Sequence, residues 1–212
     1  MIYLASQSPR RQELLQQIGV NYIVIPAAID ESPYTDELGD AYVLRMAKEK
    51  AEAGWQILHA EKKSIISSTE NSPCVLAADT SVIVDGGILG KPKDESDAKA
   101  MLMRLSNRTH QVITAVALKN RRQMETRLSV SNVTFRALTD TDVQAYIRSG
   151  EPLDKAGAYA IQGLGAIFVQ HLAGSYSGVM GLPLTETAEL LQLMDVPTGL
   201  SSWRKQLERA DE

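Results

Sequence analysis

The sequence lacks the features of a secreted or membrane protein. Cys74 is the only cysteine among 212 residues, so no internal disulfide can form, and a free thiol suits a reducing compartment. No apolar run is long enough to span a bilayer. The chain reaches Pro9 and two arginines after a very short apolar run, which is unlike a signal peptide. We therefore expect a cytoplasmic protein with no membrane partner.

An excess of basic residues is also missing. Lysine and arginine number 22 against 26 aspartates and glutamates, which gives a net charge of −4 and a pI near 5.5. This balance argues against nucleic acid as a partner, although a local cluster of cations can still bind a small anion. Hydrophobic residues make up 44% of the chain, which is typical of a soluble globular protein.

The common signatures of nucleotide and metal sites are absent as well. Neither G-x-x-x-x-G-K-[ST] nor G-x-G-x-x-G occurs, and residues 163–165 (GLG) lack the third glycine. His59, His110 and His171 do not have the spacing of metal ligands. Cys74 has no obvious partner base, so we expect a strand residue and not a nucleophile.

The hydrophobic pattern predicts helices interleaved with strands. The predicted helices cover residues 9–18, 38–58, 94–105, 139–147 and 184–194. The predicted strands cover residues 2–5, 22–25, 74–78, 81–84, 111–118, 126–135 and 166–172. Residues 64–73 read as a loop, and residues 150–165 contain too many glycines for a helix. Because a hairpin lies among these alternating elements, we expect an α/β fold with a mixed sheet.

Two arginines lie where a helix normally prefers carboxylates. Ser8 and Pro9 have the pattern of an N-cap and a first helical residue, and Arg10 and Arg11 follow directly. Each exposed arginine costs about 0.3–1 kcal/mol at the positive end of the helix dipole. An anion bound there would turn this cost into an attraction, which favours a phosphate site. We then expect neither arginine to stabilise the protein in the absence of the anion. The alternative is two solvated surface arginines, or one paired with a nearby acid.

One carboxylate interrupts an apolar strand. Asp79 lies within residues 75–84 (VLAADTSVIV), and an unpaired buried carboxylate is very costly. It therefore needs a metal, a cation or a solvent-exposed strand end. Lys91 follows in a rigid corner after the next turn, and a carboxylate and a lysine across a hairpin suit metal-assisted phosphate chemistry. The alternative is that Asp79 only caps a turn.

The glycine-rich residues 150–165 contain Gln162. Its carboxamide offers a donor and an acceptor side by side, which complements the N3–H and neighbouring carbonyl of uracil or thymine. The same amide could instead satisfy the backbone. A second glycine-rich stretch, residues 174–183, is expected to form another wall of the same cleft.

Several motifs in one order resemble the Maf family. They are residues 4–11 (LASQSPRR), 77–80 (AADT), 89–92 (LGKP), 150–159 (GEPLDKAGAY), 161–163 (IQG) and 181–183 (GLP). The resemblance runs from Met1 to about Met194. It implies an elongated mixed α/β sheet with flanking helices and a deep cleft, related to the inosine-triphosphate pyrophosphatases, and a homodimer. We accordingly expect one domain over residues 1–196, with two lobes around the cleft, and a charged tail over residues 197–212.

The resemblance also implies a reaction, the hydrolysis of a nucleoside triphosphate between its α- and β-phosphates with Mg²⁺ or Mn²⁺. Asp79 is then the general base, and Asp79 and Glu31 hold the metal. The phosphate and metal site is lined by Ser6, Arg10, Arg11, Glu31, Lys50 and Lys91. Three positions correlate with substrate specificity in the family, namely Arg10, Thr80 and Gln162. This combination of residues occurs in the branch that hydrolyses dTTP and UTP.

Two rival functions remain open at this point. A pyrophosphatase for other modified nucleotides, such as purine triphosphates, is disfavoured by Gln162 and Arg10. A non-catalytic regulator of septum formation that binds nucleotide or DNA is disfavoured by Asp79 and by the acidic pI.

The loop at residues 64–73 looks longer than is usual in the family. The expected role is removal of unwanted or modified pyrimidine nucleotides.

Overall fold

The computed structural model describes residues 1–61 and 73–203. Its centre is a seven-stranded sheet in the order β2-β1-β3-β5-β6-β7, with β4 paired to β3. The strands are β1 Ile2–Leu4, β2 Tyr22–Val24, β3 Val75–Val84, β4 Gly87–Leu89, β5 Thr109–Lys119, β6 Met124–Phe135 and β7 Val169–Ala173. β1 is parallel to β2 and β3, and the other pairs are antiparallel. The expected α/β fold with a mixed sheet is confirmed.

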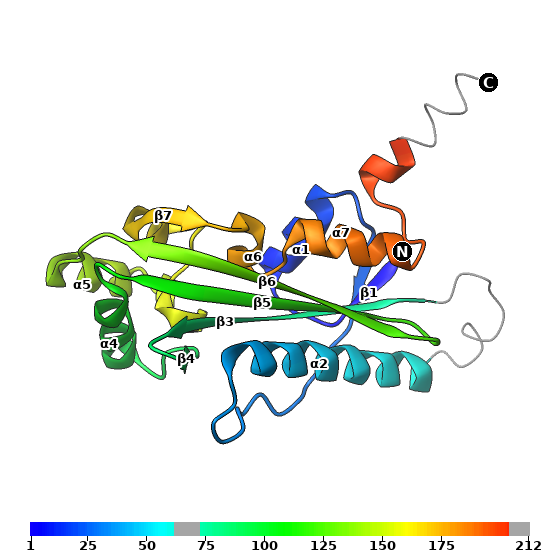
Figure 1. The fold of residues 1–212 in the computed structure, drawn as a ribbon, viewed down its shortest axis with the longest axis horizontal. Helices are drawn as coiled ribbons and strands as arrows, with labels where there is room; N and C mark the ends of the chain where they lie inside the picture. Colours follow the sequence, from blue (N-terminus) through cyan, green and yellow to red (C-terminus); the bar gives the residue numbers. More distant parts are fainter. Residues whose placement is uncertain (62–72, 204–212) are drawn as a thin grey trace.

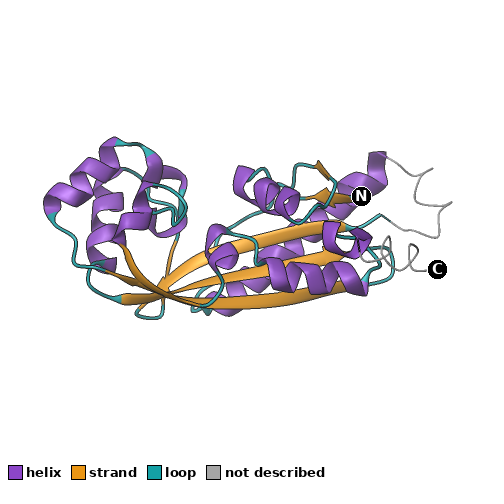
Figure 2. Cartoon of the chain, turned by 90° about the horizontal axis from the view of Figure 1, so that it is seen from above, coloured by secondary structure: helices purple, strands orange, loops and turns teal. Residues whose placement is uncertain are grey.

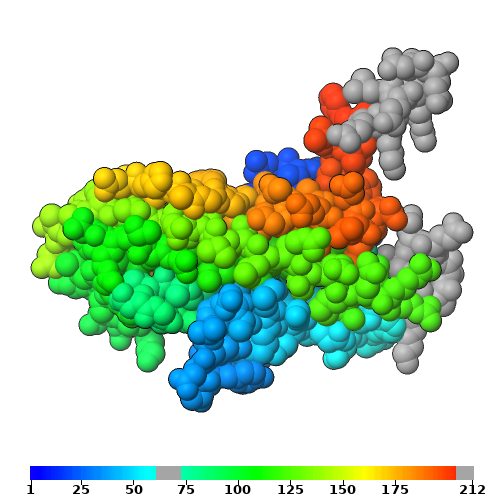
Figure 3. Space-filling view, viewed as in Figure 1, coloured from blue at the N-terminus to red at the C-terminus, as the bar shows by residue number. Residues whose placement is uncertain are grey.

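Helices cover both faces of this sheet. They are α1 Pro9–Gln17, α2 Gly39–Glu61, α4 Glu95–Leu105, α5 Asp140–Arg148, α6 Tyr176–Met180 and α7 Leu184–Leu193. α2 lies along one face, and α1, α6 and α7 lie on the other (Figure 1). α4 and α5 gather at one end of the long strands (Figure 2). The molecule is elongated along these strands, and the segment before α2 protrudes below them (Figure 3).

Strand alternation separates the packing on the two faces. Val75 and Ala77 of β3 pack with buried residues of α2 such as Met46. Leu76 and Ala78, which point the other way, pack with residues of α1 and α7. Alanines on the α2 side of the sheet, such as Ala77 and Ala115, leave room for the helix to pack closely against it.

β3 differs from its prediction as two short strands at 74–78 and 81–84. It is one unbroken strand in which Asp79 is paired with Ala115 of β5. The side chain interrupts the apolar pattern while the backbone continues the ladder, so Asp79 does not cap a turn and that alternative is wrong.

The edge of β3 beside Asp79 is open. β1 pairs with β3 only as far as Leu76, and β4 begins to pair with it at Val82. Residues 77–81 therefore have no neighbouring strand on that side within the described chain. Asp79 and Thr80 point to opposite faces, yet both reach the same space at this open edge.

Other boundaries also differ from expectation. The glycine-rich residues 150–165 contain 3-10 turns, namely η1 Glu151–Asp154, η2 Ala156–Ala158 and the start of η3 Leu164–Phe168. β7 consequently begins at Val169 and not at residue 166. Ser8 is the N-cap of α1, but its side chain makes no capping hydrogen bond.

The two segments set apart in the sequence are only partly described. Residues 64–72 of the expected loop lie outside the described residues. Of the expected tail, residues 199–203 are helical, and the Gly199 amide donates to the carbonyl oxygen of Ile18 at 2.8 Å. The domain boundary at residue 196 stays a prediction. Across residues 1–61 and 73–203, we find no helix with the length and apolarity needed to cross a membrane.

Candidate active site

A cleft of about 850 Å³ opens at the free edge of β3. Its walls come from the start of α1, the segment before α2, the centre of β3, the corner after β4, and the segments around η2 and α6. The structure brings all nine predicted site residues to these walls, namely Ser6, Arg10, Arg11, Glu31, Lys50, Asp79, Thr80, Lys91 and Gln162. Residues 179–181 also line the cleft, so the second glycine-rich stretch forms a wall as expected, partly as the short helix α6.

A lysine joins two carboxylates on one side of the cleft. Lys50 Nζ lies 2.7 Å from Asp79 Oδ1 and 2.7 Å from Glu31 Oε1. Lys50 comes from α2 and Asp79 from β3, and only 9% and 8% of their surfaces are exposed. The buried carboxylate therefore has the cationic partner that its position in an apolar strand requires.

The two carboxyl groups have opposite pKa shifts. Burial raises the pKa of Asp79, although the charges of Lys50 and Arg11 partly oppose this. Partial burial would also raise the pKa of Glu31, but its bond to Lys50 and the nearby cations lower it overall. Paired acids with diverging pKa values are typical of sites that separate proton transfer from charge stabilisation.

These two carboxylates fit a hard divalent cation. They converge on one position that a positive charge, Lys50 Nζ, already occupies. No group of three or more His, Cys, Asp or Glu side chains suited to a metal occurs in the described ranges. Mg²⁺ is commonly held by only one or two protein carboxylates together with waters and substrate phosphates. The side chains are therefore compatible with a metal that binds together with a phosphate ligand.

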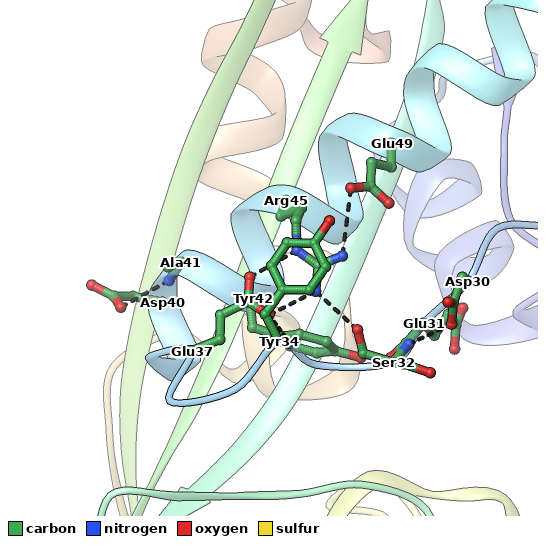
Figure 4. Close-up of polar contacts among 10 residues, drawn as sticks. All are labelled: Asp30, Glu31, Ser32, Tyr34, Glu37, Asp40, Ala41, Tyr42, Arg45 and Glu49. Carbon is green, nitrogen blue, oxygen red and sulfur yellow. Dashed lines mark hydrogen bonds and ion pairs between the residues drawn. The ribbon is translucent and has the colours of Figure 1, made fainter.

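The segment that carries Glu31 is fastened to α2 by an arginine. Arg45 donates to both carboxylate oxygens of Glu37, at 2.7 and 2.6 Å, and to the carbonyl oxygen of Ser32 at 3.0 Å. Tyr42, one turn earlier on α2, donates its hydroxyl to the Glu31 carbonyl at 2.8 Å. Figure 4 shows Arg45 reaching from the helix into this segment. Glu31 is thus held near Lys50 by its backbone as well as by its side chain.

Arg11 has a structural role that the sequence did not reveal. Its guanidinium donates to the Gly181 carbonyl at 2.8 Å, to Ser6 Oγ at 3.1 Å and to Thr80 Oγ1 at 3.5 Å. It therefore ties α1 to β3 and to the end of α6. The expectation that both arginines leave the free protein unaided is corrected for Arg11, because these contacts join three separate walls of the cleft.

Arg10 differs from its neighbour. It lines the cleft half-buried, and among the described residues it makes no hydrogen bond or ion pair. Burial lowers the pKa of Arg10, and the charge of Glu151 is the largest opposing influence. The first turn of α1 contains no acidic residue. Arg10 is thus a cation available to a ligand at a helix N-terminus, which favours anion binding.

The opposite wall supplies further cations. Lys91 is exposed in the corner after β4, as expected. Lys155, which sequence reasoning did not assign, also lines the cleft and pairs with Asp154. Lys155 is the lysine of the GEPLDKAGAY motif at residues 150–159. A lysine beside an aspartate in sequence reads as an ordinary surface pair, however, and only the fold turns it inward.

Gln162 lies half-buried in the cleft, close in sequence to Tyr159 and Ile161, which also line it. In the part of the chain that the structure describes, the Gln162 carboxamide makes no hydrogen bond. The alternative that this amide satisfies the backbone is therefore not realised, and its donor and acceptor remain available for a ligand.

Cys74 was expected within a strand, but it lies buried one residue before β3 begins at Val75. Burial raises the pKa of Cys74 to about 11, which disfavours a nucleophilic thiolate. Burial lowers the pKa of His110 to about 4, so this residue is neutral at physiological pH. Its Nε2 lies 2.9 Å from the Tyr159 hydroxyl within an aromatic cluster.

The chain is similar to several known proteins. Residues 1–194 match the family described as Maf, Maf-like protein. The "dTTP/UTP pyrophosphatase" of Pasteurella multocida (strain Pm70) is 53% identical over 196 residues, covering 92% of this chain and 96% of that protein. The protein of the same name from Escherichia coli O157:H7 is 52% identical over 190 residues, covering 90% and 91%. The structure of the Staphylococcus aureus Ham1 protein aligns with 79% of each chain at 17% sequence identity and a TM-score of 0.41.

Proposed function

The chain belongs to the Maf family, and from this we propose that it is a nucleoside triphosphate pyrophosphatase that hydrolyses dTTP and UTP to the monophosphate and diphosphate. The relatives at 53% and 52% identity bear the name dTTP/UTP pyrophosphatase. The observation that carries the proposal is the buried Asp79 bonded to Lys50 in a cleft that Arg10, Arg11 and Lys91 also line. The proposed role is the removal of unwanted or modified pyrimidine nucleotides.

Asp79 is the proposed general base. Its carboxylate accepts a proton from the water molecule that cleaves the α–β anhydride, and the diphosphate leaves. Burial raises the pKa of this group, which makes it a stronger proton acceptor than an exposed aspartate. Lys50 opposes that shift and favours the ionised carboxylate, which is the form that can accept a proton. Its bond of 2.7 Å to Asp79 Oδ1 also orients this carboxylate, which lines the cleft.

The cations of the cleft bind the triphosphate and stabilise the charge that develops on its oxygens. Arg10 and the free amides at the start of α1 face one side, and Lys91 and Lys155 face the other. Asp79 and Glu31 would hold Mg²⁺ or Mn²⁺. When bound, such an ion neutralises phosphate charge and lowers the pKa of the attacking water.

Base selection is assigned in part to Gln162, with Arg10 and Thr80. A carboxamide can present an acceptor to N3–H and a donor to the adjacent carbonyl of uracil or thymine. Cytosine reverses this pattern, and an unpaired buried polar group costs about 1–3 kcal/mol, enough for roughly ten- to hundredfold selectivity.

The proposal also includes a cytoplasmic homodimer without a nucleic-acid partner, which rests on the family resemblance and the acidic pI.

The direct test is diphosphate release from a panel of nucleoside triphosphates with Mg²⁺ or Mn²⁺. We expect kcat/KM to be highest for dTTP and UTP, with CTP and the purine triphosphates roughly ten- to hundredfold lower. Omission of the divalent ion should abolish turnover. Hydrolysis of CTP or 7-methyl-GTP as fast as UTP would contradict the assignment.

Replacing Arg10 with alanine should weaken triphosphate binding without destabilising the free protein. Arg10 makes no ion pair among the described residues, and its charge at the N-terminus of α1 is unfavourable without an anion. The measurement is the rise in melting temperature on adding dTTP with Ca²⁺ in place of the catalytic metal. We expect a smaller rise in Arg10→Ala than in wild type. Arg148→Ala is the matched control, because Arg148 is an exposed arginine of α5 that does not line the cleft, and equal rises in all three proteins would argue against a phosphate site.

A further inference from the structure

Gln162 lies in a short segment, residues 160–165. Hydrogen bonds from side chains that do not line the cleft hold this segment in place. The Gln162 side chain makes no hydrogen bond among the described residues, so its position depends on the backbone that carries it. A carboxamide can also rotate to match the wrong base. A fixed backbone does not stop that rotation, but it sets the position from which the amide approaches the base, so selectivity depends on how the 160–165 segment is held.

The carboxylate of Glu151 holds the far end of this segment. Glu151 Oε2 accepts from the Leu164 amide at 3.0 Å, and Oε1 accepts from the Gly165 amide at 3.1 Å. The Tyr146 hydroxyl donates to Glu151 Oε1 at 2.7 Å and accepts from the Ala160 amide at 3.1 Å. The two side chains thus fasten both ends of a segment whose middle is Gln162.

Two glycines of the segment permit this close approach. A Cβ at Gly163 would lie 2.3 Å from Glu151 Oε2, and a Cβ at Gly165 would lie 2.8 Å from the Tyr146 hydroxyl. Any larger residue at either position would displace the network. The ring of Tyr146 is itself fixed, because it packs edge-on against Phe168 with 5.0 Å between ring centroids.

Glu151 also acts on the phosphate side of the cleft. Burial lowers the pKa of Arg10, and the charge of Glu151 is the first of the influences that oppose this shift. One carboxylate therefore influences both a proposed phosphate-binding cation and the proposed base-reading amide.

We propose that Glu151, acting with Tyr146, is a positioning residue that holds the 160–165 segment and so determines where the Gln162 amide meets the base. This inference rests on the proposed function, since it explains how that function distinguishes uracil from cytosine. Glu151→Gln removes the charge and places an N–H₂ group against backbone donors. Tyr146→Phe removes only the hydroxyl that links Ala160 to Glu151.

The experiment compares kcat/KM for UTP and CTP in wild type and variants. We expect the UTP:CTP ratio to fall about three- to tenfold in Glu151→Gln and in Tyr146→Phe, and at least as far in Gln162→Leu. Asp142→Asn is the matched control, because its carboxylate also accepts a backbone amide, that of Thr139 at 3.0 Å, but outside the cleft. A loss of stability alone would lower activity on both substrates equally.

Hydrogen exchange of the Ala160 and Gly165 amides gives a readout that does not depend on activity. Faster exchange of these amides in Glu151→Gln and Tyr146→Phe, with a reduced UTP:CTP ratio, would support the proposal. An unchanged ratio in both variants would overturn it, whatever their absolute rates. If wild type fails to hydrolyse UTP at all, the proposed function fails, and unchanged exchange would show that the positioning role fails separately.

Discussion

Replacement of Asp79 by asparagine is expected to lower kcat by about 10²–10⁴-fold, the usual cost of losing a general base. The fold should survive, because the backbone of Asp79 continues the ladder with Ala115 and asparagine keeps the shape of the side chain. Steady-state diphosphate release measures the effect, and circular dichroism checks the fold. Asp85→Asn, in the turn that follows the same strand, is the matched control and should keep wild-type turnover.

The pH dependence of kcat/KM in the wild-type protein should reflect the protonation of Asp79. Burial raises the pKa of Asp79 above that of an exposed aspartate. Below that raised pKa the group is protonated and cannot accept a proton, so kcat/KM should fall with acidity at a higher pH than an ordinary aspartate would cause. A variant Asp79→Asn with more than roughly a tenth of wild-type kcat would show that Asp79 is not the base.

Replacement of Lys50 by methionine should destabilise the protein by about 3–5 kcal/mol near neutral pH, the range found when one partner of a buried ion pair is removed. Lys50 bonds Asp79 and Glu31 at 2.7 Å each, and 11% of the Asp79 side chain is exposed. Without the ammonium group, Asp79 must be buried either as an unpaired carboxylate or in its protonated form. Urea unfolding monitored by tryptophan fluorescence measures the difference.

The destabilisation should depend on pH in a defined direction. The pKa of Asp79 is already raised in the folded protein, and loss of Lys50 raises it further. A group with a raised folded pKa contributes stability below its unfolded pKa and loses it as pH rises through the folded value. The cost of Lys50→Met should therefore be larger at about pH 8 than at about pH 5.

A double variant isolates the interaction between the two residues. Asp79→Asn removes the charge that Lys50 neutralises, so Lys50→Met should cost less stability in that background than in wild type. Glu31 remains in both backgrounds and is more exposed, with 53% of its side chain accessible, so its contribution should be small. Equal costs in the two backgrounds, or a cost independent of pH, would mean that Lys50 does not stabilise Asp79.

Much of the secondary structure follows from local pattern. The helices at residues 38–58 and 94–105 were predicted within a few residues, because their apolar residues recur at helical spacing. The helix predicted at residues 139–147 is α5, which begins with a capping box formed by Thr139 and Asp142. The glycine-rich residues 150–165 were not predicted as 3-10 turns, because side-chain bonds such as Tyr146 to the Ala160 amide and Glu151 to the Leu164 amide join residues 14 and 13 positions apart, which local pattern does not reveal.

The sequence by itself determined the α/β class and, through its ordered motifs, which residues were candidates for the site. Only the tertiary structure decided how those residues act together. Arg11 bonds Gly181 across a separation of 170 residues, and Lys50 bonds Asp79 across 29. The open edge of β3 likewise depends on where β1 ends and where β4 begins to pair. Local pattern records the residue type at each position, whereas a charge's partner and burial depend on contacts that form only when distant segments pack.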